Sequence, residues 1–195
     1  AYYYDAPSGE PELKQAIRER YKQRSTPING QHLCITAGCQ NALFLALSVI
    51  CQPGDSVAVE SPGFYGVLQL LEQLKLNVVE IPASPVTGID LTQLELVLKN
   101  NKLKACVVTP NFATPTGALM PDENKQKLLE LANRHKFTIV EDDIYGELTF
   151  TEDVKPLLAY DTQDRVILCG SFSKSLSRDL RLGWIVSKRW QDAIL

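Results

Sequence analysis

Histidine and paired cysteine are scarce in this sequence, and their scarcity argues against a metal site. The two histidines, His32 and His135, lie far apart and lack the spacing of metal ligands, so we interpret both as structural or surface residues. The five cysteines are odd in number and include no C-x-x-C pair; they occupy positions 34, 39, 51, 106 and 169. We therefore expect reduced, buried thiols in a cytoplasmic protein rather than a disulfide framework or a zinc site.

Long apolar runs and a strong excess of charge are also absent. No stretch approaches the roughly 20 apolar residues that span a membrane, and the first residues lack the basic and apolar regions of a signal peptide. The net charge of −3 gives this segment no reason to bind nucleic acid or an anionic membrane by itself. With 195 residues, 45% hydrophobic and 22% charged, the chain has the composition of a soluble globular protein with its own core.

Short apolar runs alternate with amphipathic segments, which predicts an α/β fold. Seven runs are typical of strands, at residues 33–36, 56–60, 77–81, 105–109, 137–141, 165–169 and 182–187. Five segments are predicted helices, at residues 10–24, 38–51, 63–74, 90–99 and 121–135. The continuous apolar runs indicate a three-layer α/β/α domain with a seven-stranded, mostly parallel sheet. The last two runs are too close for a parallel crossover, so we expect the final strand to be antiparallel.

The segment at residues 170–184 has the composition of a reactive centre. An apolar run ends there in small hydroxylic residues and presents one lysine, Lys174. Desolvation lowers the pKa of an amine, and a neutral amine condenses with an aldehyde to form a Schiff base. Ser171, Ser173 and Arg181 are donors suited to a phosphate, so pyridoxal 5′-phosphate is the ligand that this segment suggests. An ordinary lysine on a polar surface loop is the alternative interpretation.

Other predicted strand ends carry residue types that suit the same ligand, since open parallel sheets bind ligands beyond the carboxyl ends of their strands. Gly38 and Cys39 open a helix whose N–H groups suit a phosphate, although a plain strand-to-helix turn has the same pattern. Phe64 is placed to stack on a flat ring or to pack in the core. Asp142, with Tyr145 three residues further on, is a carboxylate that can keep a pyridine nitrogen protonated or cap a helix.

On these residues the chain resembles the fold type I pyridoxal-phosphate enzymes of the class I and II aminotransferase family, over nearly its whole length. The resemblance implies that Lys174, in an S-x-S-K turn, is the Schiff-base lysine and the catalytic acid and base. It also implies that Asp142 meets the pyridine nitrogen and that Tyr145 meets the ring oxygen. The residues expected to bind the cofactor beside these three are Tyr4, Gly38, Cys39, Phe64, Thr114, Ser171, Ser173 and Arg181.

One position departs from the family pattern, and another implies a partner. The family's N-P-T-G loop reads T-P-T-G here, so Thr114 replaces the asparagine that would bind the ring oxygen. We expect a weaker or longer hydrogen bond from Thr114, which leaves Tyr145 as the main donor. The family's Y-x-x-x-x-G segment matches residues 4–9, and its tyrosine, Tyr4, would reach the neighbouring active site in a homodimer.

The opening sequence and the serine-rich segment SFSKSLSRDLRLGW are similar to the aminotransferase-like half of MocR-type GntR-family transcriptional regulators. That resemblance implies that residues 1–195 are a cofactor-binding large domain whose N-terminal and C-terminal companions are missing. DNA would then be bound only through the missing N-terminal domain, and the ligand would be an amino-acid substrate or effector. A free-standing aminotransferase is the alternative. A domain that has lost its cofactor is the third interpretation, and the presence of Lys174, Asp142, Tyr145 and Arg181 argues against it.

Overall fold

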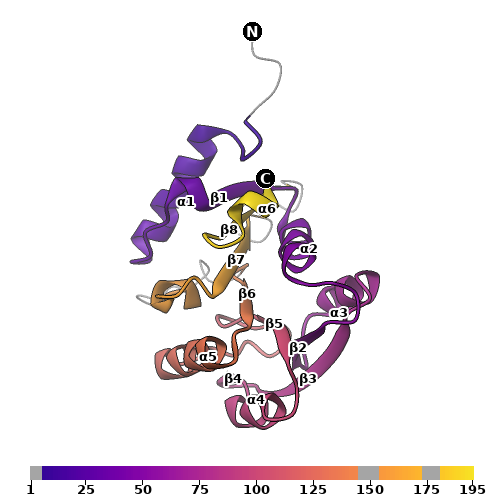
Figure 1. Cartoon of the computed structure of the whole chain (residues 1–195). Coiled ribbons are helices and arrows are strands. Elements are labelled where there is room, and N and C mark those ends of the chain that lie inside the picture. The colour runs from indigo at the N-terminus through magenta and orange to yellow at the C-terminus, as the bar shows by residue number, and fades with distance from the viewer. Residues whose placement is uncertain (1–5, 145–153, 173–180) are drawn as a thin grey trace.

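The computed structural model describes residues 6–144, 154–172 and 181–195. Within these ranges one sheet contains eight strands in the order β1-β8-β7-β6-β5-β2-β3-β4 (Figure 1). The strands are β1 Leu33–Thr36, β2 Ser56–Ser61, β3 Asn77–Ser84, β4 Gly88–Ile89, β5 Leu103–Val108, β6 Thr138–Asp142, β7 Val166–Ser171 and β8 Gly183–Val186.

The sheet is mostly parallel, as predicted. Strands β3, β2, β5, β6 and β7 pair with their neighbours in parallel, and β8 runs antiparallel between β7 and β1. The expectation that the final strand is antiparallel is therefore confirmed. The predicted number of seven strands was one too few, because β4 pairs only two of its residues with β3 and is too short to show a periodic pattern.

All five predicted helices are confirmed, and their ends lie within two residues of the expected positions. They are α1 Pro11–Gln23, α2 Cys39–Ile50, α3 Tyr65–Gln73, α4 Leu91–Leu98 and α5 Asp122–His135. Three shorter elements were not predicted, namely the 3-10 turns η1 Gly30–His32 and η2 Leu157–Tyr160 and the final helix α6 Gln191–Ile194. A single turn is too short for amphipathic periodicity to identify it.

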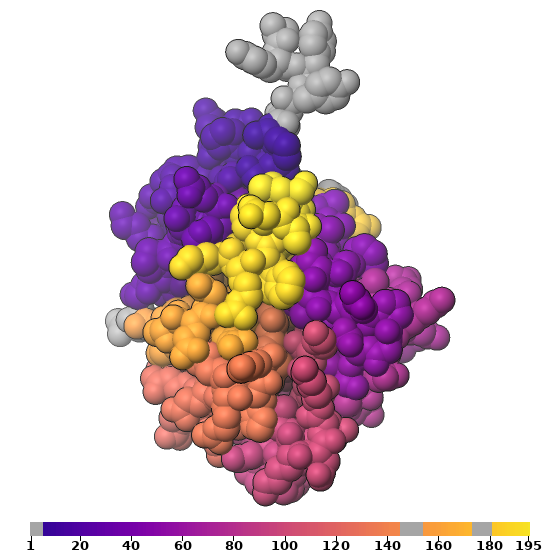
Figure 2. All heavy atoms as spheres, viewed as in Figure 1, coloured from indigo at the N-terminus to yellow at the C-terminus, as the bar shows by residue number. Residues whose placement is uncertain are grey.

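Helices cover both faces of the sheet, which gives the expected three layers (Figure 1). Alternate strand residues point to opposite faces. On one face, Val140 and Ile167 pack with Leu43 and Leu47 of α2, together with α3 and α6. On the other face, α4 and α5 cover the centre of the sheet and α1 covers β1, β7 and β8. Figure 2 shows the yellow C-terminal residues at the surface between the indigo N-terminal region and purple α2.

Two further observations bear on the expectations drawn from composition. Cys34, Cys39, Cys106 and Cys169 are buried free cysteines, and Cys51 is a half-buried one. Among the described helices, none combines the length and the apolar character needed to cross a membrane.

Candidate functional site

The candidate site lies at the carboxyl edge of the parallel strands. The register aligns Val108 of β5 with Glu141 of β6, and Asp142 of β6 with Cys169 of β7. These three neighbouring strands therefore end at nearly the same level. The segment after β1 reaches the same edge, since Thr36 of β1 is level with Gly183 of β8, and Gly183 is level with Ser171 of β7.

Gly38 and the first turn of α2 form one side of this edge. Gly38 has φ +95°, a conformation that favours glycine, and its carbonyl accepts a hydrogen bond from Thr36 Oγ1 at 2.9 Å. A Cβ atom on Gly183 would lie 2.5 Å from the Gly38 carbonyl carbon, so the two backbones meet closely. Among the described residues no side chain caps α2, and its first turn contains no acidic residue, so its terminal N–H groups suit an anion.

Asp142 is the buried carboxylate at the centre of the edge. Its Oδ1 atom accepts hydrogen bonds from the Cys39 thiol, at 3.5 Å, and from the Ile144 N–H, at 3.3 Å. Burial raises the pKa of Asp142 to about 7, and the two donors offset only part of that increase. A cationic ring nitrogen beside Asp142 would favour its ionised form and lower this pKa.

Cys39 lies between the N-terminus of α2 and the Asp142 carboxylate. The sequence predicts that Cys39 binds phosphate through the backbone N–H groups at the start of its helix, and the Cys39 side chain points toward Asp142. Burial, together with the charge of Asp142, raises the pKa of the Cys39 thiol, so the thiol stays protonated and donates. The N-terminus of α2 and the Asp142 carboxylate are therefore separated by a single side chain.

The remaining described site residues differ in how deeply they are buried. Phe64 precedes α3 and is 42% exposed. A Cβ atom on Gly66 would lie 2.5 Å from Phe64 Cε1 and 2.9 Å from Gln40 Nε2, so the Phe64 ring lies close to α2. Ser171 is buried at the end of β7, where its Oγ donates to the Leu182 carbonyl at 3.2 Å. Thr114 is half-buried in the loop between β5 and α5, and Arg181 is exposed just before β8.

Four predicted residues lie outside the described ranges. They are Tyr4, Tyr145, Ser173 and Lys174. Their roles remain predictions from the sequence.

The structure adds acidic residues that the sequence reasoning did not assign. Glu60, in β2, accepts the Thr109 N–H at 3.3 Å and so holds the beginning of the loop that contains Thr114. Burial raises the pKa of Glu60 to about 8. Glu141 is fully buried and accepts the Leu157 N–H at 2.6 Å. An acidic residue inside or at the end of an otherwise apolar strand was the available signal for both.

The described part of this edge fits pyridoxal phosphate. The open N-terminus of α2 suits a phosphate, Asp142 suits a pyridine nitrogen, and the half-exposed ring of Phe64 suits stacking on a flat ring. A metal site finds no comparable support, because the described residues include no group of three or more His, Cys, Asp or Glu side chains placed to hold an ion.

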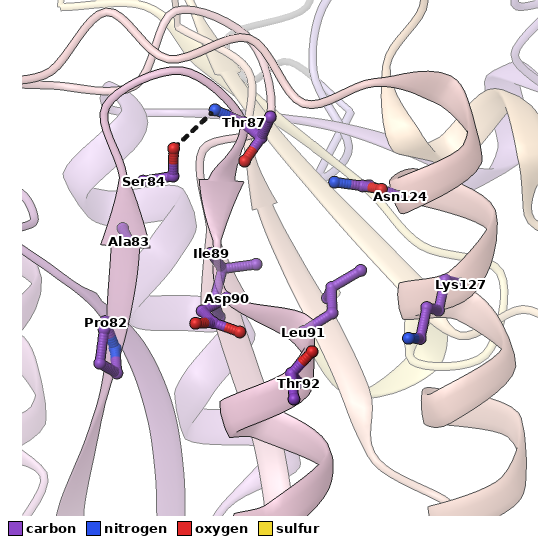
Figure 3. A pocket seen from close by; sticks show the side chains of 10 residues that line it. All are labelled: Pro82, Ala83, Ser84, Thr87, Ile89, Asp90, Leu91, Thr92, Asn124 and Lys127. Carbon is purple, nitrogen blue, oxygen red and sulfur yellow. Dashed lines mark hydrogen bonds between the residues drawn. The ribbon is translucent and has the colours of Figure 1, made fainter.

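A separate groove of about 470 Å³ lies between α4, α5 and the β3–β4 turn (Figure 3). Ser84 Oγ accepts the Thr87 N–H there at 3.3 Å, and Asp90 caps α4 by accepting the Gln93 N–H at 3.1 Å. Lys127 of α5 points into the groove from the other side (Figure 3). Because Ser84 and Asp90 are already occupied by local turns, we assign no ligand to this groove.

Comparisons with known proteins agree with the geometry. The family model "Aminotransferase class I and II" matches residues 3–194. The chain is 41% identical to the uncharacterized HTH-type transcriptional regulator YjiR of Escherichia coli, over 98% of this chain and 41% of that protein. It is 36% identical to aromatic-amino-acid aminotransferase 1 of Thermococcus litoralis, over 96% of this chain and 46% of that protein.

A solved structure extends the likeness to the fold. The kynurenine aminotransferase of Pyrococcus horikoshii, solved in complex with PMP, superposes with a TM-score of 0.90 and is 33% identical. The match covers 98% of this chain and 49% of that chain. The chain therefore spans less than half the length of each of these relatives, and it is homologous both to regulators and to free-standing aminotransferases.

Proposed function

Because the chain belongs to the aminotransferase class I and II family, we propose that residues 1–195 form the pyridoxal-phosphate-binding large domain of a longer protein. The domain binds its cofactor at the carboxyl edge of the sheet and acts on an amino acid. Pyridoxal phosphate, when bound, supplies an electron sink for a carbanion at the α-carbon of an amino acid. The PMP in the Pyrococcus horikoshii structure supports the choice of cofactor.

One observation carries this proposal. The Cys39 thiol lies 3.5 Å from Asp142 Oδ1, so an anion-binding helix end and a buried carboxylate are joined across one side chain. Pyridoxal phosphate needs both features, one for its phosphate and one for its ring nitrogen. A surface loop with an ordinary lysine would require neither an uncapped helix nor a carboxylate buried at a strand end.

The roles of the side chains follow from this orientation. Asp142 holds the proton of the pyridine nitrogen, and Phe64 covers one face of the ring. The N–H groups at Gly38 and Cys39, with Ser171, Ser173 and Arg181, hold the phosphate. Lys174 would hold the cofactor through its aldehyde and, once the amino group of the substrate has displaced it, would move a proton at the substrate α-carbon. Tyr145 and Thr114 donate to the ring oxygen, with Tyr145 as the stronger donor.

The likeness to YjiR favours a regulatory setting. In this proposal the domain is the effector-sensing or catalytic half of a MocR-type transcriptional regulator in the cytoplasm, and DNA is bound by another domain. A homodimer is part of the proposal, with Tyr4 reaching the neighbouring site. The second candidate is a free-standing aminotransferase, which the likeness to the Thermococcus litoralis enzyme supports.

Visible absorption of the purified protein with added pyridoxal phosphate tests the cofactor assignment. We expect an absorption band that borohydride removes. Because borohydride reduces the Schiff base and fixes the cofactor to its lysine, mass mapping should find the cofactor on the peptide that contains Lys174. Lys174→Ala should lose the band, and Lys188→Ala, which changes an exposed lysine, should keep it. A band that persists in Lys174→Ala would contradict the assigned role of Lys174.

Two assays on the full-length protein separate the candidates. The regulator predicts that an amino acid changes DNA binding only in the presence of pyridoxal phosphate. The free-standing enzyme predicts transfer of an amino group to a 2-oxo acid and no DNA binding. Transfer without any effect on DNA would favour the second candidate.

A further inference from the structure

A buried polar cluster lies directly behind Asp142 and has no part in the proposed function. It consists of Tyr21 and Arg24 at the end of α1, Asp143 after β6, and Trp184 in β8. Tyr21 is 0% exposed, Trp184 is 1% exposed and Asp143 is 3% exposed. We call these four residues the α1 clamp. Its members are up to 163 residues apart in the sequence.

The hydrogen bonds of the clamp converge on the Asp143 carboxylate. Arg24 donates two hydrogen bonds to it in a bidentate arrangement, from Nη1 to Oδ2 at 2.5 Å and from Nη2 to Oδ1 at 3.0 Å. Tyr21 Oη donates to Oδ2 at 2.9 Å and accepts from Trp184 Nε1 at 3.0 Å. A paired, two-pronged contact of this kind fixes orientation as well as distance. The Asp143 side chain therefore has little freedom to rotate.

Strand alternation relates this clamp to the candidate site. Consecutive residues of a strand point to opposite faces of the sheet. At the end of β6, Glu141 faces η2 and Asp142 faces α2, and Asp143, the next residue, faces α1. The Asp143 N–H also continues the sheet by donating to the Cys169 carbonyl at 2.8 Å. Holding Asp143 on the α1 side thus holds its neighbour Asp142 on the α2 side.

Charge gives a second reason for the clamp. Three buried carboxyl groups follow one another in the chain, and a buried carboxylate is costly unless a cation pairs with it. Arg24 supplies that cation, with a side chain only 11% exposed. Among the described residues, the other charged groups that interact electrostatically with Asp143 include Glu141, Asp142 and Lys125. Lys125 donates to the Lys155 carbonyl at 2.8 Å, so it is held away from the clamp contacts.

We infer that Asp143, gripped by Arg24 and Tyr21, is a positioning residue that holds the Asp142 carboxylate toward α2 and couples the docking of α1 to the cofactor site. The inference rests on the proposed function, because Asp142 is there the partner of the pyridine nitrogen. The clamp also balances the charge next to Asp142, which leaves Asp142 as the carboxylate available to a cationic ring.

Three conservative variants of the full-length protein test this role. Tyr21→Phe removes one hydroxyl, Arg24→Lys keeps the charge but loses the two-pronged grip, and Asp143→Asn keeps the shape but loses the charge. Arg134→Gln is the control, because it breaks an exposed ion pair with Glu95 at 3.8 Å. Circular dichroism and thermal melting first establish that each variant folds, and Tyr21→Phe, the mildest change, keeps the test informative if another variant does not fold.

Two readouts separate positioning from stability alone. The first readout is the affinity for pyridoxal phosphate, together with the pH dependence of its visible absorption band. In Asp143→Asn we expect at least about tenfold weaker binding and a shift in the pH at the midpoint of the band's titration. In Arg24→Lys we expect smaller changes of both. The second uses no cofactor: NMR of ¹³Cγ-labelled aspartate follows the titration of Asp142, assigned with Asp142→Asn. We expect this titration to move in every folded clamp variant and not in Arg134→Gln.

The outcomes are distinguishable. Folded clamp variants with unchanged cofactor affinity, band and Asp142 titration would overturn the positioning role. If the unmodified protein binds no pyridoxal phosphate, the proposed function fails by itself, and the Asp142 titration then decides the positioning role alone. A shift of that titration in the variants would support it, and an unchanged titration would reject it.

Discussion

At the scale of single residues, Gly183 marks a place in the site where its backbone lies close to that of Gly38. A methyl group on Gly183 would lie 2.5 Å from the Gly38 carbonyl carbon and 2.7 Å from its oxygen, and backbone atoms cannot rotate away as a side chain can. We expect Gly183→Ala to lower the free energy of unfolding by about 2 kcal/mol and to weaken cofactor binding, because α2 must shift. Urea unfolding followed by circular dichroism measures the loss.

Gly30→Ala is the matched control for that change. Its added methyl group would meet Arg18 Cδ at 3.4 Å, which is an ordinary contact with a flexible side chain. We expect a change within about 0.5 kcal/mol. Equal losses in the two variants would show that the contact with Gly38 has no special importance.

The cysteines give a second prediction at this scale. Burial raises the pKa of the Cys39, Cys106 and Cys169 thiols, and it raises the pKa of the half-buried Cys51 to about 11. Thiols react as thiolates, so we expect iodoacetamide to label Cys51 first and slowly, and to label all five cysteines only in urea. Peptide mass mapping reads out each position. Rapid labelling of Cys106 in the folded protein would contradict the described packing.

At the scale of elements, Glu141 attaches η2 to β6. Its carboxyl group accepts the Leu157 N–H at 2.6 Å and the Leu158 N–H at 3.4 Å. Burial, followed by the nearby charge of Asp143, raises the pKa of Glu141 to about 8, so a neutral side chain matches its charge at pH 7. We expect Glu141→Leu to cost about 2 kcal/mol of stability, because two N–H groups lose their acceptor.

Glu141→Gln should restore part of that stability, since its amide oxygen can still accept the Leu157 N–H, whereas its NH2 group cannot accept the Leu158 N–H. Thermal unfolding of both variants at pH 7 provides the measurement. Similar melting temperatures for the leucine and glutamine variants would mean that η2 is held by its apolar contacts, such as buried Leu157, and not by Glu141.

The sequence predicted elements better than contacts between them. The apolar runs located seven strands and five helices, because each is long enough to show its period. Residues at the strand ends, such as Gly38 and Asp142, were predictable because a parallel sheet brings those ends together. The grip of Arg24 on Asp143 joins positions 119 residues apart. No local pattern encodes such a pair.

At the scale of the whole molecule, the buried carboxyl groups give stability an unusual dependence on pH. Burial raises the pKa of Glu60 and of Glu141 to about 8, and that of Asp142 to about 7. In the unfolded chain these groups lose their protons near pH 4. Between pH 4 and pH 8 the folded chain therefore binds more protons than the unfolded chain, and its stability falls as the pH rises.

We expect the cofactor-free protein to lose more than about 2 kcal/mol of unfolding free energy between pH 6 and pH 8, since each of the three groups contributes up to about 1.4 kcal/mol per pH unit. Urea titrations at pH 6, 7 and 8 measure the slope, and Asp142→Asn should flatten it and be the more stable protein at pH 8. Saturating pyridoxal phosphate should oppose the loss, because its ring nitrogen favours ionised Asp142 and because a ligand stabilises the state that binds it. A stability that rises from pH 6 to pH 8 without cofactor would show that these carboxyl groups are already ionised in the folded chain, and would contradict the raised pKa values of Glu60, Glu141 and Asp142.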